Sequence, residues 1–436
     1  MTDPQEGSQP TSRLRRRGLA VAALIVLVLA IGACGGDDDD APADDSEDAP
    51  SGQDAATLLG PEDAATGDPV KLGLVSDGAT QAFDNTDELR AGQATVDYLN
   101  AHKKGVAGHP IELVTCETGG DPSGASDCAN QMVEEGVAAV ALSQSAVAEA
   151  MWEPLHEAGV TTFYFQNNSE DMLADTESSF VIVNPLSTLM GVPVAVAEDE
   201  GADTVAFVTI DVPAALTLFE SGAVDGIFEN AGLEYDLVRV PPGTADMTTQ
   251  MQEVASSGAG AVNVIGNDAF CIAAFQGLDA VGYDGAITSI SQCITDATRE
   301  ALPDGLEGIQ ISATQAVGAS DDPAYQLYEA VMATYGEDVE DVDNALAMGG
   351  YTVTAALAAA LNGADGDITA ETAPGIIQAM EESDYPGADG LTFQCGGSAS
   401  PDEPAVCMNG SLRATLDADG NPATYEPVDP DVLEGS

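Results

Sequence analysis

From residue 70 onward, the hydrophobic positions alternate between short apolar runs and longer stretches with helical spacing. The run VKLGLVSDG ends at Gly78, residues 87–105 carry apolar side chains at helical spacing, and residues 109–122 alternate as a strand that stops at glycines. We therefore predict that Val70–Pro122 forms one complete strand–helix–strand unit with a loop at each strand end.

The same alternation then continues in two series. In the first, strands are predicted at Val137–Leu142, Thr161–Phe165 and Val181–Val183, with helices at Ser123–Gly136 and Ala146–Ala158. In the second, strands are predicted at Thr204–Ile210, Tyr235–Val240, Ala261–Ile265 and Ala286–Ile290, with helices at Leu189–Glu200, Ala215–Ala231, Met247–Ser257 and Ala269–Val281. Because alternating strands and helices form parallel sheets, the pattern predicts an α/β fold with two doubly wound lobes.

The last part of the chain has a different pattern. Pro323–Tyr335 and Ala345–Leu361 are long helical stretches, a short helix is predicted at Thr372–Glu381, and Gly390–Ser436 is typical of hairpin-like strands. Asp417–Asn421 has turn chemistry. A calcium loop is the alternative there, but the glycine falls at the fourth position rather than at the sixth.

Residues 1–33 have the build of a secretory signal. Arginines at 13 and 15–17 precede the apolar run Leu19–Ile31, and small residues follow before a cysteine. That run is shorter than the roughly 20 residues that a membrane-spanning helix needs. The segment LAIGACG around Cys34 resembles the bacterial lipobox, with Ile31 where leucine is usual. This resemblance implies that Cys34 receives diacylglycerol; an uncleaved anchor or a chance cysteine is the alternative.

Composition changes abruptly at Cys34. Residues 35–68 are rich in Asp, Ala, Gly and Pro without apolar periodicity, so they bury too little surface to offset the entropy of ordering. We expect residues 34–68 to form a disordered acidic tether. The chain carries 74 acidic against 11 basic side chains, a net charge of −63. Such a surface repels nucleic acid and anionic lipid, so we expect neither as a direct binding partner.

Six cysteines follow Cys34, and an even number in an exported protein implies disulfides with 15 possible pairings. They fall into three local couples, which predict the bonds Cys116–Cys128, Cys271–Cys293 and Cys395–Cys407. Zinc is the alternative, but no couple has the C-x2-C spacing and no histidine lies close by in sequence.

The sequence offers little for catalysis. His102, His109 and His156 form no metal-binding pattern, and the nucleophile-elbow, phosphate-loop and dinucleotide motifs are missing from the sequence. Acidic residues are so frequent that a catalytic carboxylate pair cannot be distinguished from surface charge. We expect neither an enzyme nor a bound metal or cofactor.

Several segments together resemble a known family. VKLGLVSDG, then DYLNAHKKGVAGHPIELV, ETGGDPSGASDCANQMVEEGVAAV, FVTI and AVNVIGND occur in this order. They resemble the type I periplasmic binding proteins of ABC importers, in the branch of the leucine/isoleucine/valine-binding and amide-binding receptors. The resemblance covers roughly Val70–Val428.

The resemblance implies a two-lobe clamshell with a ligand in the cleft and three crossings between lobes, near 183–187, 310–314 and 394–413. The lobes would be 69–184 plus 315–393, and 185–314 plus 394–436. It further implies a lipid-anchored, monomeric solute-binding protein on the extracytoplasmic face of the bacterial membrane, which captures a small polar solute and delivers it to an ABC permease and its ATPase. A ligand-sensing or surface-interaction lipoprotein with the same clamshell is the alternative.

Candidate ligand residues lie where strands end, because open parallel sheets bind ligands beyond the carboxyl ends of their strands. They are Ser76, Phe83, Ser143, Gln144, Ser145, Gln166, Asn167, Asp211, Asn267, Asp268 and Gln292. The loop 143–145 either caps the helix that follows it or uses its hydroxyls and backbone N–H groups to bind an oxygen of the ligand. The resemblance favours ligand binding. Phe83 is included because its loop is otherwise small and polar.

The second lobe departs from the family pattern. Amino-acid receptors in the family commonly have an aromatic residue after the strand that corresponds to Thr204–Ile210 and a glutamate near Ser291–Gln292; this chain has neither. Asp211 or Asp268 would then pair with an ammonium group, since a buried charge needs a partner. An amino acid, a neutral amide and another small polar molecule all remain open as the solute.

Overall fold

The computed structural model describes residues 52–80, 84–143, 145, 147–167, 169–220, 222–303, 305–400 and 403–428. The predicted secretory signal, the lipidation site Cys34, Phe83 and Gln144 lie outside these residues. Within the described part of the chain, no helix is both long and apolar enough to cross a membrane.

The first sheet has six parallel strands in the order β13-β5-β4-β3-β1-β2. The strands are β1 (Val70–Ser76), β2 (Ile111–Glu117), β3 (Ala139–Leu142), β4 (Thr161–Gln166), β5 (Ser179–Val183) and β13 (Val406–Met408). Its helices are α2 (Thr86–His102), α3 (Pro122–Glu135), α4 (Ala148–Glu157), α5 (Glu170–Ala174), α12 (Pro323–Tyr335) and α13 (Ala345–Leu361).

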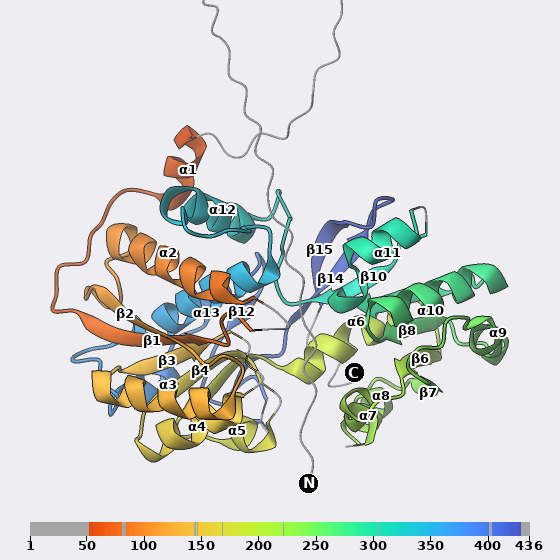
Figure 1. Cartoon of the computed structure of the whole chain (residues 1–436), viewed down its shortest axis with the longest axis horizontal. Coiled ribbons are helices and arrows are strands. Elements are labelled where there is room, and N and C mark those ends of the chain that lie inside the picture. Colours follow the sequence, from red (N-terminus) through yellow and green to blue (C-terminus); the bar gives the residue numbers. More distant parts are fainter. Residues whose placement is uncertain are drawn as a thin grey trace, which may run out of the picture. The chain divides into compact units, whose positions relative to one another are not determined.

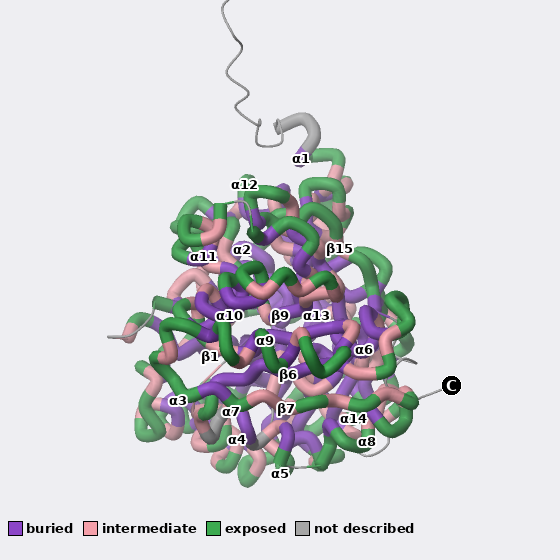
Figure 2. The backbone as a smooth tube through the Cα atoms, turned by 90° about the vertical axis from the view of Figure 1, so that its right-hand side faces the viewer, coloured by how far each residue is buried: buried purple, intermediate pink, exposed green. Residues whose placement is uncertain are grey.

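Helices cover both faces of this sheet: α2 and α13 lie on one face and α3 and α4 on the other (Figure 1). Apart from the edge strand β2, of which only Ile111 is buried, the strands are buried almost throughout; buried residues are purple in Figure 2. Two apolar clusters fill the interfaces between the sheet and its helices. Continuous apolar runs such as Ala139–Leu142 are what a parallel sheet covered on both faces requires.

The second sheet has seven strands in the order β15-β14-β10-β9-β8-β6-β7. The strands are β6 (Thr204–Ile210), β7 (Glu234–Val240), β8 (Ala261–Ile265), β9 (Ala286–Ile290), β10 (Gln310–Ala313), β14 (Ser411–Leu416) and β15 (Pro422–Val428). Its helices are α6 (Pro185–Glu200), α7 (Pro213–Glu220), α8 (Ala223–Asn230), α9 (Thr248–Ser257), α10 (Asp268–Val281) and α11 (Asp296–Ala301), with a 3₁₀ turn η1 (Ser291–Cys293).

Strands β6 to β10 are parallel to one another. The hairpin β14–β15 extends the sheet beyond β10, and β14 pairs antiparallel with β10. The hairpin turn is the predicted Asp417–Asn421 turn, in which Asp417 accepts hydrogen bonds from the backbone N–H groups of Asp419 and Asn421. Among the described residues, no group of three or more Asp, Glu, His or Cys side chains is placed to hold a metal ion.

The chain crosses from one sheet to the other three times, after β5, after β10 and after β13. The predicted α/β fold with two doubly wound lobes and three crossings is thus confirmed. We call the first sheet with its helices the first lobe, and the second sheet with its helices the second lobe. Outside both sheets, a two-stranded ribbon pairs β11 (Ser383–Asp384) with β12 (Thr392–Phe393) and follows the short helix α14 (Ala373–Gln378).

The third crossing lies later than the predicted lobe boundary. Residues 394–408 had been expected in the second lobe, but β13 pairs with β5 through Val406–Val181 and Met408–Val183. Val406 is also buried in the apolar cluster of the first lobe. The boundary is therefore corrected to residues 409–410, because backbone pairing ties the disulfide-closed segment to the first sheet.

The tether prediction is wrong for residues 52–68. Gly52–Leu59 forms helix α1, which packs against α12 and buries Ala55 and Leu59 in the core of the first lobe. The backbone N–H of Asp63 then donates to the carbonyl of Ala101. Acidic composition concealed a short amphipathic helix whose few apolar residues share one face.

The described cysteines form the three predicted disulfides, Cys116–Cys128, Cys271–Cys293 and Cys395–Cys407. They join β2 to α3, α10 to η1, and the segment after β12 to β13. Each disulfide thus links two neighbouring segments of the same lobe.

Candidate functional site

A pocket of about 690 Å³ has walls from both lobes. The first lobe contributes residues at the ends of β3 and β4 and the start of α4, and the second contributes residues at the start of α6 and the ends of β9 and β10. The lining residues are Pro122, Ser145, Val147, Ala148, Glu149, Ala150, Gln166, Asn167, Ser169, Pro185, Thr188, Leu189, Ile290, Ser291, Gln292, Ser312, Ala313 and Thr314. The pocket therefore combines apolar side chains with neutral hydroxyls and amides and one carboxylate, that of Glu149.

Ser145 is held in one orientation at the first-lobe wall. Its hydroxyl donates to Asp77 Oδ1 at 2.7 Å and accepts from the backbone N–H of Val147 at 3.1 Å. Asp77 follows β1 and is only 2% exposed, and its Oδ1 also accepts from the Thr118 hydroxyl at 2.7 Å. The buried carboxylate of Asp77, which follows β1, therefore fixes the orientation of the Ser145 hydroxyl, which follows β3.

Asn167 follows β4 and faces the same pocket. Its Oδ1 accepts from the backbone N–H of Ser169 at 2.7 Å, which orients the amide and leaves its nitrogen to donate. Gln166, the last residue of β4, lines the wall beside it. The structure thus brings the predicted residues Ser145, Gln166 and Asn167 together.

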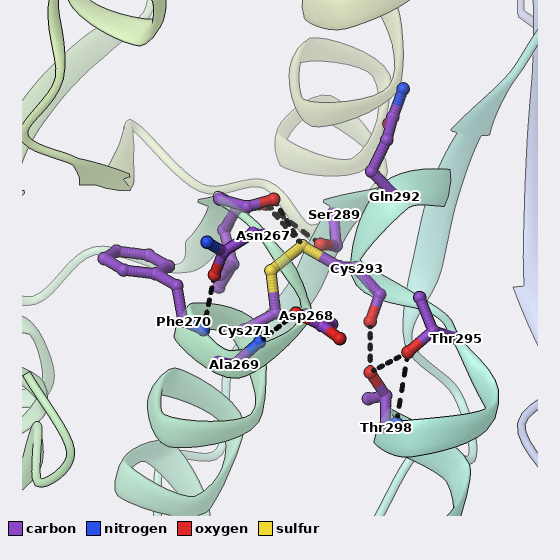
Figure 3. The surroundings of a disulfide bond; sticks show 12 residues. Asn267, Asp268, Ala269, Phe270, Cys271, Ser289, Gln292, Cys293, Thr295 and Thr298 are labelled. Atoms are coloured by element: carbon purple, nitrogen blue, oxygen red, sulfur yellow. Dashed lines mark hydrogen bonds between the residues drawn. A yellow bond between two sulfur atoms is a disulfide. The ribbon is translucent and has the colours of Figure 1, made fainter. Parts of the chain in front are cut away.

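On the second lobe, Ser291 and Gln292 line the pocket from the turn η1. Cys293 in the same turn is bonded to Cys271 of α10, and the Thr298 hydroxyl donates to its carbonyl at 2.7 Å (Figure 3). The turn that presents Gln292 is therefore anchored covalently to the helix beside it.

Two of the predicted first-lobe residues lie away from the pocket lining. The Ser76 hydroxyl donates to Glu88 Oε2 at 2.5 Å, and Ser143 also hydrogen-bonds the Glu88 carboxyl. Both serines are buried, as is Glu88, which is 1% exposed. Burial raises the pKa of Glu88 to about 7, helped by the charge of Asp77 and opposed by the two serine hydrogen bonds. Ser76 and Ser143 therefore hold a buried acid instead of lining the pocket.

The three predicted residues that follow β6 and β8 also lie away from the pocket lining. Asn267 caps α10 by accepting from the backbone N–H of Phe270 at 3.0 Å, and Asp268 accepts from its neighbour Ala269 (Figure 3). Asp211 is exposed and follows β6. None of them is among the pocket-lining residues. For Asn267 and Asp268 the reason is that side chains that cap a helix start are committed to its backbone.

Sequence reasoning missed Thr188 and Leu189 of α6, and Ser312 and Thr314 at the end of β10. The end of β10 had been interpreted only as a crossing between lobes, whereas Leu189 had been predicted as the first residue of a helix and Thr188 had been given no role. The polar residues at the end of β10 were the available indication, because the strand-end rule applies there as it does elsewhere.

Comparison with known proteins agrees with this architecture. A family model described as "Periplasmic binding protein" matches residues 69–406. No curated protein matches the chain.

Solved structures share the fold at low identity. An ABC transporter substrate-binding protein from Sphaerobacter thermophilus has a TM-score of 0.61 and 19% identity, covering 83% of this chain and 96% of that one. The branched-chain amino acid transporter substrate-binding protein LivJ from Streptococcus pneumoniae, in complex with isoleucine, has a TM-score of 0.58 and 17% identity. That match covers 83% of this chain and 99% of LivJ.

A solute-binding protein from R. palustris in complex with 4-hydroxybenzoate has a TM-score of 0.57 and 19% identity, covering 80% of this chain and 93% of that one. At these identities the structures establish the fold alone, whereas the family model covers most of the chain. The chain therefore belongs to the type I periplasmic binding proteins.

Proposed function

We propose that this chain is the lipid-anchored, extracytoplasmic solute-binding protein of an ABC importer. It captures a small polar solute in the pocket lined by Ser145, Asn167 and Gln292 and delivers it to a membrane permease. The observation that carries the proposal is a pocket with walls from both lobes, in a chain whose family binds solutes for transport.

Closure by hinge motion fits this pocket. The lobes are connected at three crossings, and Asn184 at the first one caps α6 by accepting from the backbone N–H of Leu186 at 2.9 Å. A solute that contacts both walls favours the closed arrangement over the open one, and the closed form is what a permease recognises.

We expect Asn167→Ala and Gln292→Ala each to weaken solute binding about tenfold, because each removes a hydrogen-bonding side chain from one wall of the pocket. Isothermal titration of the purified protein against amino acids, amides, sugars and small organic acids identifies a solute and measures both variants. Asn130→Ala, an exposed position on α3, is the matched control. Unchanged affinity in both pocket variants would place the site elsewhere.

We expect Cys34→Ala to release the full-length chain from bacterial membranes. In cells fed a labelled fatty acid, the unchanged chain incorporates label and sediments with membranes, and the variant does neither. Ser46→Ala, in the same acidic segment, serves as the control. A variant that still sediments with membranes would contradict lipid anchoring.

Delivery to a permease is tested by uptake. Cells that lack the chain should lose high-affinity uptake of the identified solute and regain it with the unchanged chain, but not with the pocket variants. Normal uptake together with a lost transcriptional response to the solute would instead support the sensing role.

A further inference from the structure

A buried acid lies behind the first-lobe wall of the pocket. Glu88 of α2 is hydrogen-bonded by Ser76 at the end of β1 and by Ser143 after β3. Two residues beyond Ser143, Ser145 lines the pocket, and its hydroxyl is held by Asp77, the chain neighbour of Ser76. The carboxyl of Glu88 is thus connected with one pocket residue along two short paths.

The Ser76 hydroxyl faces three partners at once. The backbone N–H of Gly78 donates to it at 3.1 Å, the carbonyl oxygen of Asn85 lies 3.1 Å away, and Oε2 of Glu88 lies 2.5 Å away. A hydroxyl has one proton and two lone pairs, so Ser76 can donate to only one of the two oxygens at a time. Which oxygen receives the proton depends on the charge of Glu88.

With Glu88 protonated on Oε2, every group around Ser76 is matched: the acid donates to Ser76, and Ser76 donates to the carbonyl of Asn85. With Glu88 ionised, Ser76 gives its proton to the carboxylate and the Asn85 carbonyl loses that donor. The backbone N–H of Asn85 also donates to the Gly78 carbonyl at 3.1 Å, so these bonds close the base of the loop 77–85. Ionisation therefore removes one of the hydrogen bonds that close the loop after β1.

The surroundings of Glu88 also favour its neutral form. Its Oε1 has no hydrogen-bond partner among the described residues. Burial raises the pKa of Glu88 to about 7 against the two serine hydrogen bonds, and the charge of Asp77 adds to the rise. Charged or titratable groups on the elements packed around it are Asp77 after β1, Glu117 on β2, Asp87 and Arg90 on α2, Tyr328 on α12 and Tyr351 on α13. Arg90, the base among them, pairs with Asp87.

We propose that Glu88 is a proton switch for the pocket: its neutral form keeps the first-lobe wall in its binding arrangement, and its ionised form weakens solute binding. This inference rests on the proposed function and adds its regulation. Solute binding favours the neutral acid, because an occupied pocket removes water from the wall in front of Asp77 and makes a second buried charge there more costly. Glu88 is a positioning residue that acts through Ser145.

The affinity for the solute should therefore be highest in mildly acid solution. The neutral form prevails below about pH 7, so the affinity is complete there and falls as the pH rises through 7. We expect a loss of about tenfold between pH 6 and pH 8. By the same linkage, the protein should take up protons when it binds a solute between these values.

Isothermal titration of the purified full-length protein at pH 6, 7 and 8 tests the switch. The panel holds amino acids, amides and sugars whose charge is constant in this range, valine, isobutyramide and ribose among them. The unchanged chain should lose about tenfold in affinity for a solute that it binds. Glu88→Gln, whose amide donates to Ser76 as the neutral acid does, should keep its pH 6 affinity at pH 8. Glu134→Gln, at an exposed position on α3, should follow the unchanged chain.

Proton uptake is a second measurement, which a merely structural role of Glu88 would not alter. Titration at pH 7.5 in phosphate and in Tris, which differ in their heats of ionisation, gives the number of protons exchanged on binding. The unchanged chain and Glu134→Gln should take up protons, whereas Glu88→Gln should not. The histidines remain in every variant, so uptake that persists in Glu88→Gln belongs to other groups.

Equal affinity at pH 6 and pH 8, tighter binding at pH 8, or a pH dependence that persists in Glu88→Gln overturns the proton switch and leaves the proposed function standing. If no solute of the panel binds at any pH, the proposed function fails and the inference fails with it.

Discussion

Replacing Cys271 and Cys293 together with alanine should lower the free energy of unfolding by about 3 kcal/mol and weaken solute binding at the same time. The bond spans 22 residues of sequence, and a cross-link of that span removes about 3 kcal/mol of conformational entropy from the unfolded chain. Binding should weaken because η1, which carries Ser291 and Gln292, loses its covalent connection to α10.

Chemical denaturation and titration of an identified solute measure these two effects separately. Cys395→Ala with Cys407→Ala is the matched control, because that bond spans 12 residues and neither cysteine lines the pocket. The control should lose a similar stability, also about 3 kcal/mol, without losing affinity. An equal loss of affinity in both double variants would mean that the Cys271–Cys293 bond has no special role at the pocket.

The fold could be predicted from the sequence because the pattern of hydrophobic positions that specifies it is local and periodic. Alternating apolar runs and helical stretches predict parallel sheets wherever both sheet faces are covered, as in β3 and β8, whose residues are all buried. The exceptions were short elements without periodicity of their own. β13 belongs to the first lobe only because its three residues pair with β5, and a long-range backbone pairing leaves no local pattern.

Only some of the pocket-lining residues could be predicted from the sequence, for a related reason. The strand-end rule locates the right edge of each sheet but does not say which side chain at that edge faces the pocket. Ser76 and Ser145 both follow that rule, yet Ser76 turns to Glu88 whereas Ser145 lines the pocket. Asp77 could have been suspected beside Ser76, but its role depends on Thr118 and Ser145, which are distant in sequence.

Glu88 was not singled out in the sequence, where it is one of 74 acidic residues. It lies in α2, and α13 approaches so closely at Gly350 that a Cβ there would collide with the Glu88 carbonyl oxygen. One carboxyl oxygen, Oε1, has no hydrogen-bond partner among the described residues. Such an environment favours the neutral acid, which is why burial raises its pKa to about 7.

Glu88→Gln should therefore stabilise the protein at alkaline pH and change little at acid pH. The pKa in the folded protein, about 7, is above the ordinary value of 4.5, so folding favours the protonated form. The resulting stabilisation is complete below about pH 4.5 and is lost as the pH rises through 7. Once the acid ionises, the folded state bears a cost of about 3 kcal/mol that glutamine, which stays neutral, avoids.

Urea denaturation of the unchanged chain and of Glu88→Gln at pH 5 and pH 8 measures this difference. The variant should be more stable by about 3 kcal/mol at pH 8 and nearly equal at pH 5. Glu134→Gln, at an exposed position on α3, should show no such dependence on pH. A Glu88→Gln protein that is less stable at pH 8 would mean that the ionised carboxylate is stabilised where it lies. Ser76 and Ser143 would then be the donors responsible, since both hydrogen bonds favour the charged form.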